Sequence, residues 1–481
     1  MRRKFQTLFV VLVLLAPGCL TQKEEKPTID RPFIEYYTIY AKLSLADHTM
    51  EVETEVLVNI PASTDEISFC LNPSFSLTNI TDEQGTPITF RRDYDLVIVD
   101  IAPLPEFTEK KLTFTYEGMV YRRVLNVTWD YVSEEGCWVR AEYNWYPVIP
   151  EAAERGCHYF TYCMNNYWAG VELSNFWDYW HQSPWTGMTL SVEVPESWTV
   201  ISSGTRVSEE VDENTRVCTW EESKPIPSIN FVAGDYDVVK DTWKGIEITS
   251  YLKEHKERAH EYIDLSKEIL DFFSEKCGDY PFSQLRIVEL PGTYGYSQGN
   301  PSFVMLDSAA LDSSGKDLAQ ALGGAIAYQW WGNVVNGYDL SAMISLDVCL
   351  SNYMSLLYLR EKYGQEEFCG YLTKCRSEVV EAFAEYGGSS VTYEFAFILS
   401  RGQERRNAVV LKTLLMFEAL KEEVGDELFL ETLRRFIADH REESVTMETF
   451  KQEFEQLSGK DLDRFFEQYY YGIDIPYVMC S

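Results

Sequence analysis

Hydrophobic residues follow two different periods along this chain of 481 residues. Between residues 31 and about 242 they alternate with polar residues, as where valines and glutamates take turns from residue 50 to residue 58. Residues 112–116 and 190–194 repeat the alternation, and proline, glycine and serine separate the runs. A period of two is typical of strands with one buried face. The first half is therefore predicted to be an antiparallel, β-rich domain.

In the second half the period lengthens to that of an α-helix. Phe429, Leu433 and Phe436 fall on one helical face. A following helix has Thr446 as its expected N-cap and Gly459 as its expected C-terminal stop. These patterns predict a mixed domain that ends in helices.

The period changes between residues 240 and 255, which places the domain boundary there. We expect an α+β protein with a β-rich domain at 31–242 and a mixed domain at 243–481, mainly helical after residue 315. Residues 137–185 interrupt the first domain with many tryptophans and tyrosines. This stretch is either an insertion packed between the domains, which we prefer because Trp and Tyr fill interfaces well, or an aromatic binding platform.

The first 19 residues have the composition of a targeting segment. A basic start, residues 2–4, precedes an unbroken apolar run at residues 8–15 that is too short to span a bilayer. Ala16-Pro17-Gly18-Cys19 then resembles a lipoprotein processing site. We expect Cys19 to carry the lipid, residues 20–30 to be a tether, and the protein to lie outside the cytoplasm, anchored to the cell membrane. Ordinary secretion is the alternative.

The net charge excludes some classes of partner, and the cysteine content bears on the compartment in which the protein folds. The net charge of −34 argues against nucleic acid and against an anionic membrane surface as partners. Ten cysteines besides Cys19 make disulfides possible after export, with Cys157/Cys163 and Cys369/Cys375 as local candidates.

Five segments resemble, in the same order, parts of the aminopeptidase N family of gluzincin zinc metallopeptidases. The segments are Ile226–Tyr236, Tyr280–Leu290, Gly295–Asn300, Leu322–Val335 and Gly459–Phe466. The resemblance implies a β-domain followed by a thermolysin-like domain. It also implies one zinc ion and removal of N-terminal residues from peptides, because active relatives have both.

The segment that resembles the zinc helix does not carry the zinc chemistry. That chemistry needs H-E-x-x-H, in which two His at i and i+4 bind zinc and the Glu is the general base. Aligned on Gln329-Trp330, these three positions hold Gly324, Ala325 and Tyr328. The third ligand falls on Asp347, or on Val348 by another alignment. Neither zinc nor another cofactor is therefore expected here, although active relatives bind zinc.

At two further positions the chain also lacks the residue that the family uses for catalysis. Gln298 stands where the family has the Glu that pairs with the α-amino group of a peptide, and an amide supplies no opposite charge. Glu404 stands nearest to the family's transition-state Tyr, and a carboxylate would repel an oxyanion. No two of the six histidines are spaced at i, i+4. We expect His255, His260 and the others to be structural or exposed.

The resulting interpretation is a pseudoenzyme: a catalytically inactive, aminopeptidase-like lipoprotein at the outer face of the cell membrane. It would bind a peptide, a protein or a glycan. The alternative is an active hydrolase, either at a non-standard metal site near Asp347 or at Ser297. Residues 295–299 fit the G-x-S-x-G motif of serine hydrolases, which also requires a strand-turn-helix and a downstream His. A third possibility is a purely structural cell-envelope component.

Overall fold

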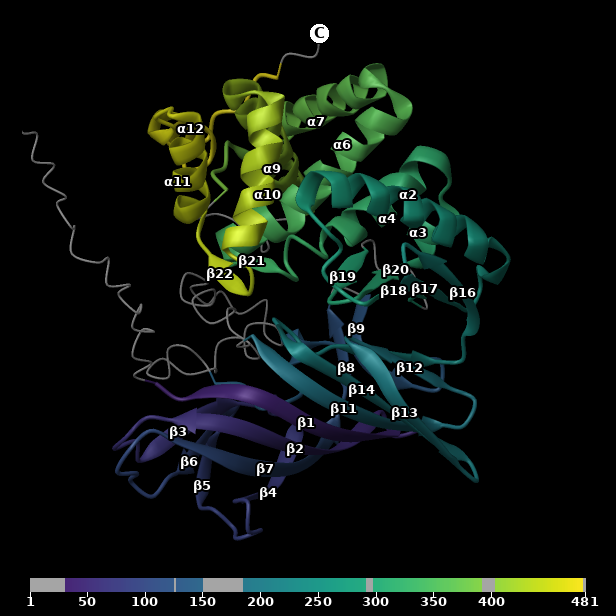
Figure 1. Ribbon diagram of the computed structural model, residues 1–481, viewed down its shortest axis with the longest axis vertical. Coiled ribbons are helices and arrows are strands. Elements are labelled where there is room, and N and C mark those ends of the chain that lie inside the picture. Colours follow the sequence, from purple (N-terminus) through teal and green to yellow (C-terminus); the bar gives the residue numbers. More distant parts are fainter. Residues whose placement is uncertain (1–30, 125–126, 150–184, 291–296, 392–402, 479–481) are drawn as a thin grey trace, which may run out of the picture.

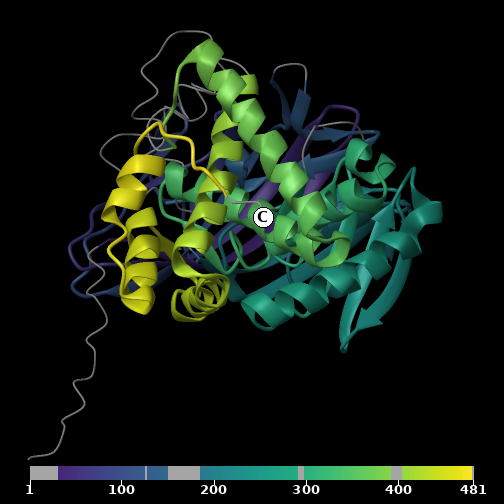
Figure 2. The same cartoon turned by 90° about the horizontal axis from the view of Figure 1, so that it is seen from above.

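The computed structural model describes residues 31–124, 127–149, 185–290, 297–391 and 403–478. The β-rich N-terminal half and the helical C-terminal half occupy opposite ends of the molecule (Figure 1). From above, the helices cover one end of the strands (Figure 2). The predicted α+β class, with strands first and helices last, is confirmed.

A seven-stranded sheet forms most of the N-terminal half. Its neighbouring strands are antiparallel except for β1 and β11, which pair in parallel. Along β2 buried and exposed residues alternate, as the valine and glutamate pattern predicted. The strands in spatial order are β13 (Thr205–Asp212), β14 (Thr215–Ile226), β11 (Thr186–Pro195), β1 (Phe33–Ser44), β2 (Thr49–Ile60), β7 (Thr108–Met119) and β4 (Phe75–Thr81).

Two smaller sheets complete this half, and both are antiparallel. The three-stranded sheet has the order β3 (Glu66–Cys70), β6 (Leu96–Asp100) and β5 (Phe90–Asp93). The five-stranded sheet has the order β12 (Thr199–Ser202), β15 (Phe231–Gly234), β10 (Gly136–Val139), β9 (Val127–Ser133) and β8 (Tyr121–Val124). A short 3₁₀ helix, η1 (Ala141–Tyr143), follows β10.

A second five-stranded sheet begins the C-terminal half. Its order is β16 (Asp237–Trp243), β17 (Ile246–Leu252), β18 (Gln284–Glu289), β20 (Phe303–Leu306) and β19 (Gln298–Asn300). Strand β19 is an edge strand that runs antiparallel to β20. The expected boundary between residues 242 and 243 falls within β16, which forms a hairpin with β17.

Helices make up most of the chain beyond this sheet. Thr446 caps the N-terminus of α11 through a hydrogen bond from Thr449 N, and Gly459 ends that helix with a φ of 67°, as predicted. The helices are η5 (Lys256–Arg258), α2 (Ala259–Cys277), α3 (Ser308–Asp312), α4 (Gly315–Ala327), α5 (Leu340–Ala342), η6 (Met343–Leu350), α6 (Ser351–Tyr363), α7 (Gln365–Tyr386), α9 (Gln403–Val424), α10 (Asp426–Asp439), α11 (Met447–Ser458) and α12 (Asp463–Tyr469). Two short strands, β21 (Val335–Gly337) and β22 (Glu443–Val445), pair in parallel.

The two halves share a buried interface between the five-stranded sheets. Apolar side chains from both sheets, including Trp138 and Phe303, form one core cluster. Arg286 on β18 is buried beside it, with its guanidinium 4.4 Å from the ring centre of Trp220. The same group donates hydrogen bonds to the carbonyl oxygens of Ser202 and Gly204. Burial lowers the pKa of Arg286 to about 10.

The described part of the aromatic stretch is packed in the core. Trp138, Trp145 and Tyr146 are fully buried, and the indole of Trp145 donates to the carbonyl of Ile229. The remainder of the predicted insertion, residues 150–184, lies outside the described residues. The preference for packing over a binding platform is therefore supported only at its N-terminal end.

The structure tests one of the expected disulfides, the one between Cys369 and Cys375. Cys369 and Cys375 both have free thiols on α7, so the predicted local disulfide between them is wrong. Six residues of α-helix separate two Cα atoms by about 9 Å along the axis, whereas a disulfide needs roughly 4.4–6.8 Å. Cys157, Cys163 and the expected lipid site Cys19 lie outside the described residues. Within the described ranges, no helix has both the length and the apolar character needed to cross a membrane.

Candidate functional site

Helix α4 is the segment that resembles a zinc helix, and two glycines, Gly323 and Gly324, lie where it packs against α6. Leucine and alanine supply its helix propensity, and Asp317 lies in the first turn, where the helix dipole favours an acid. A Cβ on Gly323 would lie 3.1 Å from Cβ of Ser355, and a Cβ on Gly324 would lie 3.1 Å from Oδ1 of Asn352. The two glycines therefore let α4 approach α6 closely.

At the positions that align with the first zinc ligand and the general base, this closely packed helix has no side chain that could bind a metal or accept a proton. Gly324 has no side chain, and Ala325, which is buried, has only a methyl group. A histidine at position 324 would displace Asn352, whose amide donates to the carbonyl of Val348 at 2.8 Å. The space of the first ligand is thus taken by helix–helix contact.

Tyr328 follows the last residue of α4, at the position of the second ligand. A Cβ on Gly332, where φ is 112°, would lie 2.3 Å from the Tyr328 ring, so only glycine fits under the ring. A Cβ on Gly299 of β19 would lie 2.5 Å from Cβ of Tyr328. Burial, together with the negative charges of Asp347 and Glu142, holds the pKa of Tyr328 well above its ordinary value. The phenol is therefore neutral and senses the charges of both carboxyl groups.

Asp347, the expected third-ligand position, lies in η6, a π-helical segment. Its side chain is buried, and Oδ1 accepts a hydrogen bond from the backbone N–H of Gly337 at 2.8 Å. Burial holds the pKa of Asp347 well above its ordinary value, and the Gly337 hydrogen bond only partly opposes this. A buried carboxyl group in this position favours its proton over a negative charge.

Gln298 begins β19 and faces the N-terminal half. Gln298 and Asn300 share one face of the strand, because alternate residues point the same way. Oδ1 of Asn300 accepts from Nδ2 of Asn230 at 2.8 Å, and Oδ1 of Asn230 accepts from the N–H of Ala141 in η1 at 2.6 Å. The next residue of η1 is Glu142. Asn230 thus joins β19 to η1, and Gln298 and Glu142 lie two residues and one residue along the chain from the groups that it bonds.

Both side chains have a buried acceptor oxygen without a hydrogen bond. These atoms are Oε1 of Gln298 and Oε2 of Glu142. A buried polar atom without a partner costs about 1–3 kcal/mol, which a ligand that donates a hydrogen bond to it would offset. We refer to Glu142, Gln298, Tyr328 and Asp347 together as the α4 site. Glu142 was missed in the sequence, where the available signal was a single acid within a buried aromatic stretch.

Gln329 and Trp330, on which the segment was aligned with the zinc helix, have structural roles. The fully buried amide of Gln329 donates to the carbonyl of Asn300 and accepts from the N–H of Ser302, both at 2.9 Å. It thereby holds the turn between β19 and β20. Trp330 packs on Phe273, and Trp331 stacks on the ring of a phenylalanine in α10. The expectation that the two tryptophans are core residues is confirmed.

The other predicted positions lie apart from the α4 site or outside the described side chains. Glu404 is in the first turn of α9, and its side chain is not described. After Ser297 come β19 and β20 rather than a helix, so the strand-turn-helix of a nucleophile elbow is not formed. His440 contacts Glu443 at 2.8 Å. His260 is exposed, and His255 is buried before α2 with structural hydrogen bonds, so both agree with the expectation.

Acidic groups also gather elsewhere. Among the described residues, one set of three potential metal ligands lies within 4.8 Å of one another: Glu455, Asp461 and Asp463 near α11 and α12. Two of the three are exposed, and Glu455 Oε1 accepts from the N–H of Leu462. The set is far from α4 in sequence and is explained by capping of the turn between the two helices.

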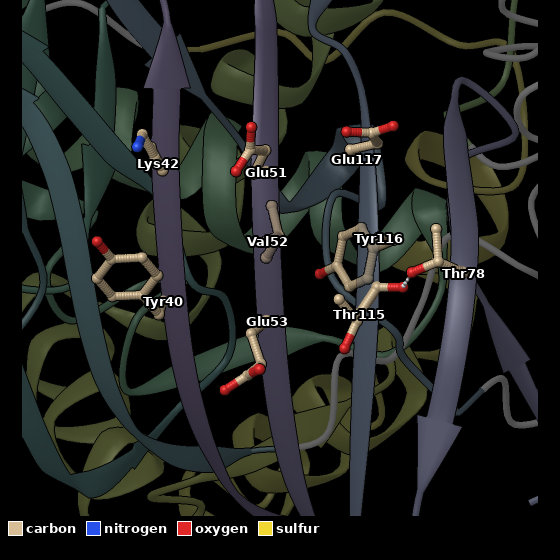
Figure 3. A pocket seen from close by; sticks show the side chains of 9 residues that line it. All are labelled: Tyr40, Lys42, Glu51, Val52, Glu53, Thr78, Thr115, Tyr116 and Glu117. Carbon is tan, nitrogen blue, oxygen red and sulfur yellow. Dashed lines mark hydrogen bonds between the residues drawn. The ribbon is translucent and has the colours of Figure 1, made fainter. Parts of the chain in front are cut away.

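A shallow depression of about 240 Å³ lies on the outward face of the seven-stranded sheet (Figure 3). Strands β1, β2, β7 and β4 line it with Tyr40, Lys42, Glu51, Glu53 and Glu117, among others. Tyr40 donates a hydrogen bond to Glu193. These side chains are the polar half of the strand alternation, which an antiparallel sheet turns toward water, so the depression requires no ligand to account for it.

Comparison with solved structures places this geometry in a known fold. No protein-family model matches the chain, and no curated protein sequence matches it. A crystal structure of the M1 zinc metallopeptidase from Deinococcus radiodurans superposes with a TM-score of 0.70 at 13% identity, covering 93% of this chain and 97% of that one. The chain has the M1 zinc metallopeptidase fold. A Glu-to-Ala mutant of that enzyme bound to Tyr-Ser-Ala matches with a TM-score of 0.69 at 14% identity, covering 93% and 96% of the two chains.

Within this M1 fold, the α4 site lacks a donor set that suits zinc. Zinc takes nitrogen, sulfur or carboxylate ligands, usually four with water included in catalytic sites. Gly324 and Ala325 offer none, and Tyr328 is a phenol that holds its proton. Asp347, which favours its protonated form, and Glu142 are two carboxyl groups, and among the described residues no three His, Cys, Asp or Glu side chains converge there. The residues present can instead accept and donate hydrogen bonds to an organic ligand.

Proposed function

We propose that the protein is a non-catalytic relative of the M1 metallopeptidases that binds the amino end of a peptide or protein at the α4 site. The loss of ligands and general base at Gly324 and Ala325 argues against hydrolysis through zinc. The proposal places the protein outside the cytoplasm, held to the membrane by a lipid on Cys19. Export and anchoring are inferred from the N-terminal sequence alone.

The two unpartnered acceptors carry the choice of ligand. Oε2 of Glu142 and Oε1 of Gln298 would be satisfied by N–H donors, and an ammonium group supplies three. Glu142 adds the opposite charge that Gln298 lacks. The M1 enzyme of similar fold was crystallised with Tyr-Ser-Ala, with L-arginine and with L-tryptophan, each of which has a free α-amino group. We therefore favour an amino terminus over a glycan, which has hydroxyl groups but no cationic end.

Calorimetric titration of the full chain with Tyr-Ser-Ala tests this proposal. We expect binding without turnover, and about tenfold weaker binding for N-acetyl-Tyr-Ser-Ala, because one charged hydrogen bond is worth roughly 1.4 kcal/mol or more. Glu142→Gln should weaken binding of the free peptide to a similar extent and leave the affinity for the acetylated peptide unchanged. Glu134→Gln, an exposed acid in the β9–β10 turn, is the matched control.

The same preparation separates inactivity from an unrecognised activity. Metal analysis should find no stoichiometric zinc, and aminoacyl fluorogenic substrates should not be cleaved. Stoichiometric zinc with chelator-sensitive cleavage would refute the proposal. Labelling of Ser297 by a serine-directed phosphonate, with loss of cleavage in Ser297→Ala, would instead establish the serine hydrolase alternative.

A further inference from the structure

His255 lies between two carboxyl groups at a junction that the proposed function does not use. Its Nδ1 is 2.8 Å from Oε1 of Glu289, at the end of β18, and its Nε2 is 3.0 Å from Oδ1 of Asp312, the last residue of α3. A neutral imidazole has one N–H and one acceptor nitrogen, so it cannot donate to both carboxylates. The geometry is that of a protonated imidazolium with both nitrogens donating.

The two contacts differ in how firmly they are held. Glu289 is buried, and its Oε2 accepts from the backbone N–H groups of Lys253, Glu254 and His255 at 2.7, 3.0 and 3.3 Å. The Asp312 side chain is 76% exposed and free to move into water. The Nδ1 proton is therefore fixed by Glu289, and the proton that can be lost is the one on Nε2. Without it, the lone pair of Nε2 would face the carboxylate of Asp312.

We propose that His255 is a pH-sensitive clasp that joins β18 to the α3–α4 connection when it is protonated and releases Asp312 when it loses the Nε2 proton. The clasp lies next to helix α4 in sequence, because α3 leads through Ser313 and Ser314 into α4. Release would be local, since Arg258 and Tyr262 also donate to the carbonyl of Leu311.

The charges around the ring extend the closed form to higher pH than for an unperturbed histidine. Burial by itself lowers the pKa of His255, but the hydrogen bonds and negative charges of Asp312 and Glu289 outweigh it and raise the pKa above its ordinary value. Arg258, in the short helix η5 that His255 precedes, pairs with Glu261 and donates to the carbonyl of Ser313. A raised pKa in the folded state means that the clasp is complete in acid and is lost as pH rises through that pKa.

Asp312→Asn is the decisive variant. The Asn amide can donate to the neutral Nε2, so the contact should become independent of pH, and the exposed site should tolerate the change. NMR titration should give the full chain a pKa for His255 above the ordinary value of ~6.5, and the variant a lower one. His260, exposed on α2, is the internal reference.

Hydrogen exchange of the α3 amides measures the release. Wild type and Asp312→Asn are compared at each pH, which removes the intrinsic pH dependence of exchange. We expect protection of Leu311 and Ser313 in the wild type to fall relative to the variant by about threefold or more above the His255 pKa. A His255 pKa at or below ~6.5, or equal protection in the two proteins at every pH, would overturn the proposal. Both readouts are independent of peptide binding, so they do not depend on the proposed function.

Discussion

At the scale of single residues, neighbouring groups fill the space at the positions that align with zinc ligands. Gly324 is filled against Asn352, and the Tyr328 ring occupies the space over Gly332. Asp347 keeps one hydrogen bond, from Gly337. A buried carboxyl group without a cation is costly when charged, so it retains its proton instead.

Asp347→Asn tests this assignment. In the folded protein burial raises the pKa of Asp347 above the value of ~3.9 in the unfolded chain, so the wild type loses stability as pH rises between the two values. The amide should keep the Gly337 hydrogen bond and escape this loss. The variant should therefore gain stability relative to wild type with increasing pH, by ~1.4 kcal/mol for each unit of pKa difference.

Urea unfolding from pH 4 to pH 8 measures the difference. Asp235→Asn, at an exposed position, serves as the control and should show no such trend. A difference between Asp347→Asn and wild type that stays constant over this range would show that Asp347 is ionised in the folded protein.

At the scale of secondary-structure elements, the approach of β19 to α4 depends on one glycine. A Cβ on Gly299 would lie 2.6 Å from the carbonyl oxygen of Ala325 and 2.5 Å from Cβ of Tyr328. Gly299→Ala should therefore force the strand away from the helix and reduce the free energy of unfolding by about 1–3 kcal/mol. Thermal or urea unfolding measures the change.

Gly370 provides the matched control for this substitution. It is exposed within α7, and nothing lies within 4 Å of the position that a methyl group would take there. Gly370→Ala should stabilise the protein by up to ~1 kcal/mol, because alanine has the higher helix propensity. Equal effects at the two positions would contradict the close strand–helix contact.

The sequence predicted these elements unevenly. The alternation of valine and glutamate predicted β2 correctly because one face of that strand is buried and the other solvated. Thr446 and Gly459 predicted the ends of α11 because capping is a local property. The sequence did not reveal the partners of His255, because Glu289 and Asp312 are 34 and 57 residues away in the chain.

At the scale of the whole molecule, the two halves are held together by a buried polar contact as well as by apolar packing. Arg286 crosses from β18 to the carbonyls of Ser202 and Gly204 in the N-terminal half. Arg286→Leu should leave these carbonyls without donors and lower the free energy of unfolding by about 3 kcal/mol or more. Lys240→Leu, which removes only an exposed pair with Glu247, should cost less than ~1 kcal/mol.

Unfolding followed by two probes would locate the effect. If the halves unfold together, near-UV circular dichroism and fluorescence that reports the burial of the Trp220 indole should show one transition in wild type. Arg286→Leu should lower the midpoint of that transition or split it in two. An unchanged midpoint would show that the apolar cluster alone holds the halves together.

By itself the sequence determined the order of strands and helices, the M1-like succession of segments and the absence of zinc-binding side chains at positions 324 and 325. Each of these depends on local periodicity or on which atoms a residue has. Only the tertiary structure revealed the unpartnered oxygens of Glu142 and Gln298, the filling of Gly324 by Asn352 and the two carboxyl groups around His255. Those features arise where distant segments meet, and burial and hydrogen-bond pairing there depend on the packed fold rather than on spacing along the chain.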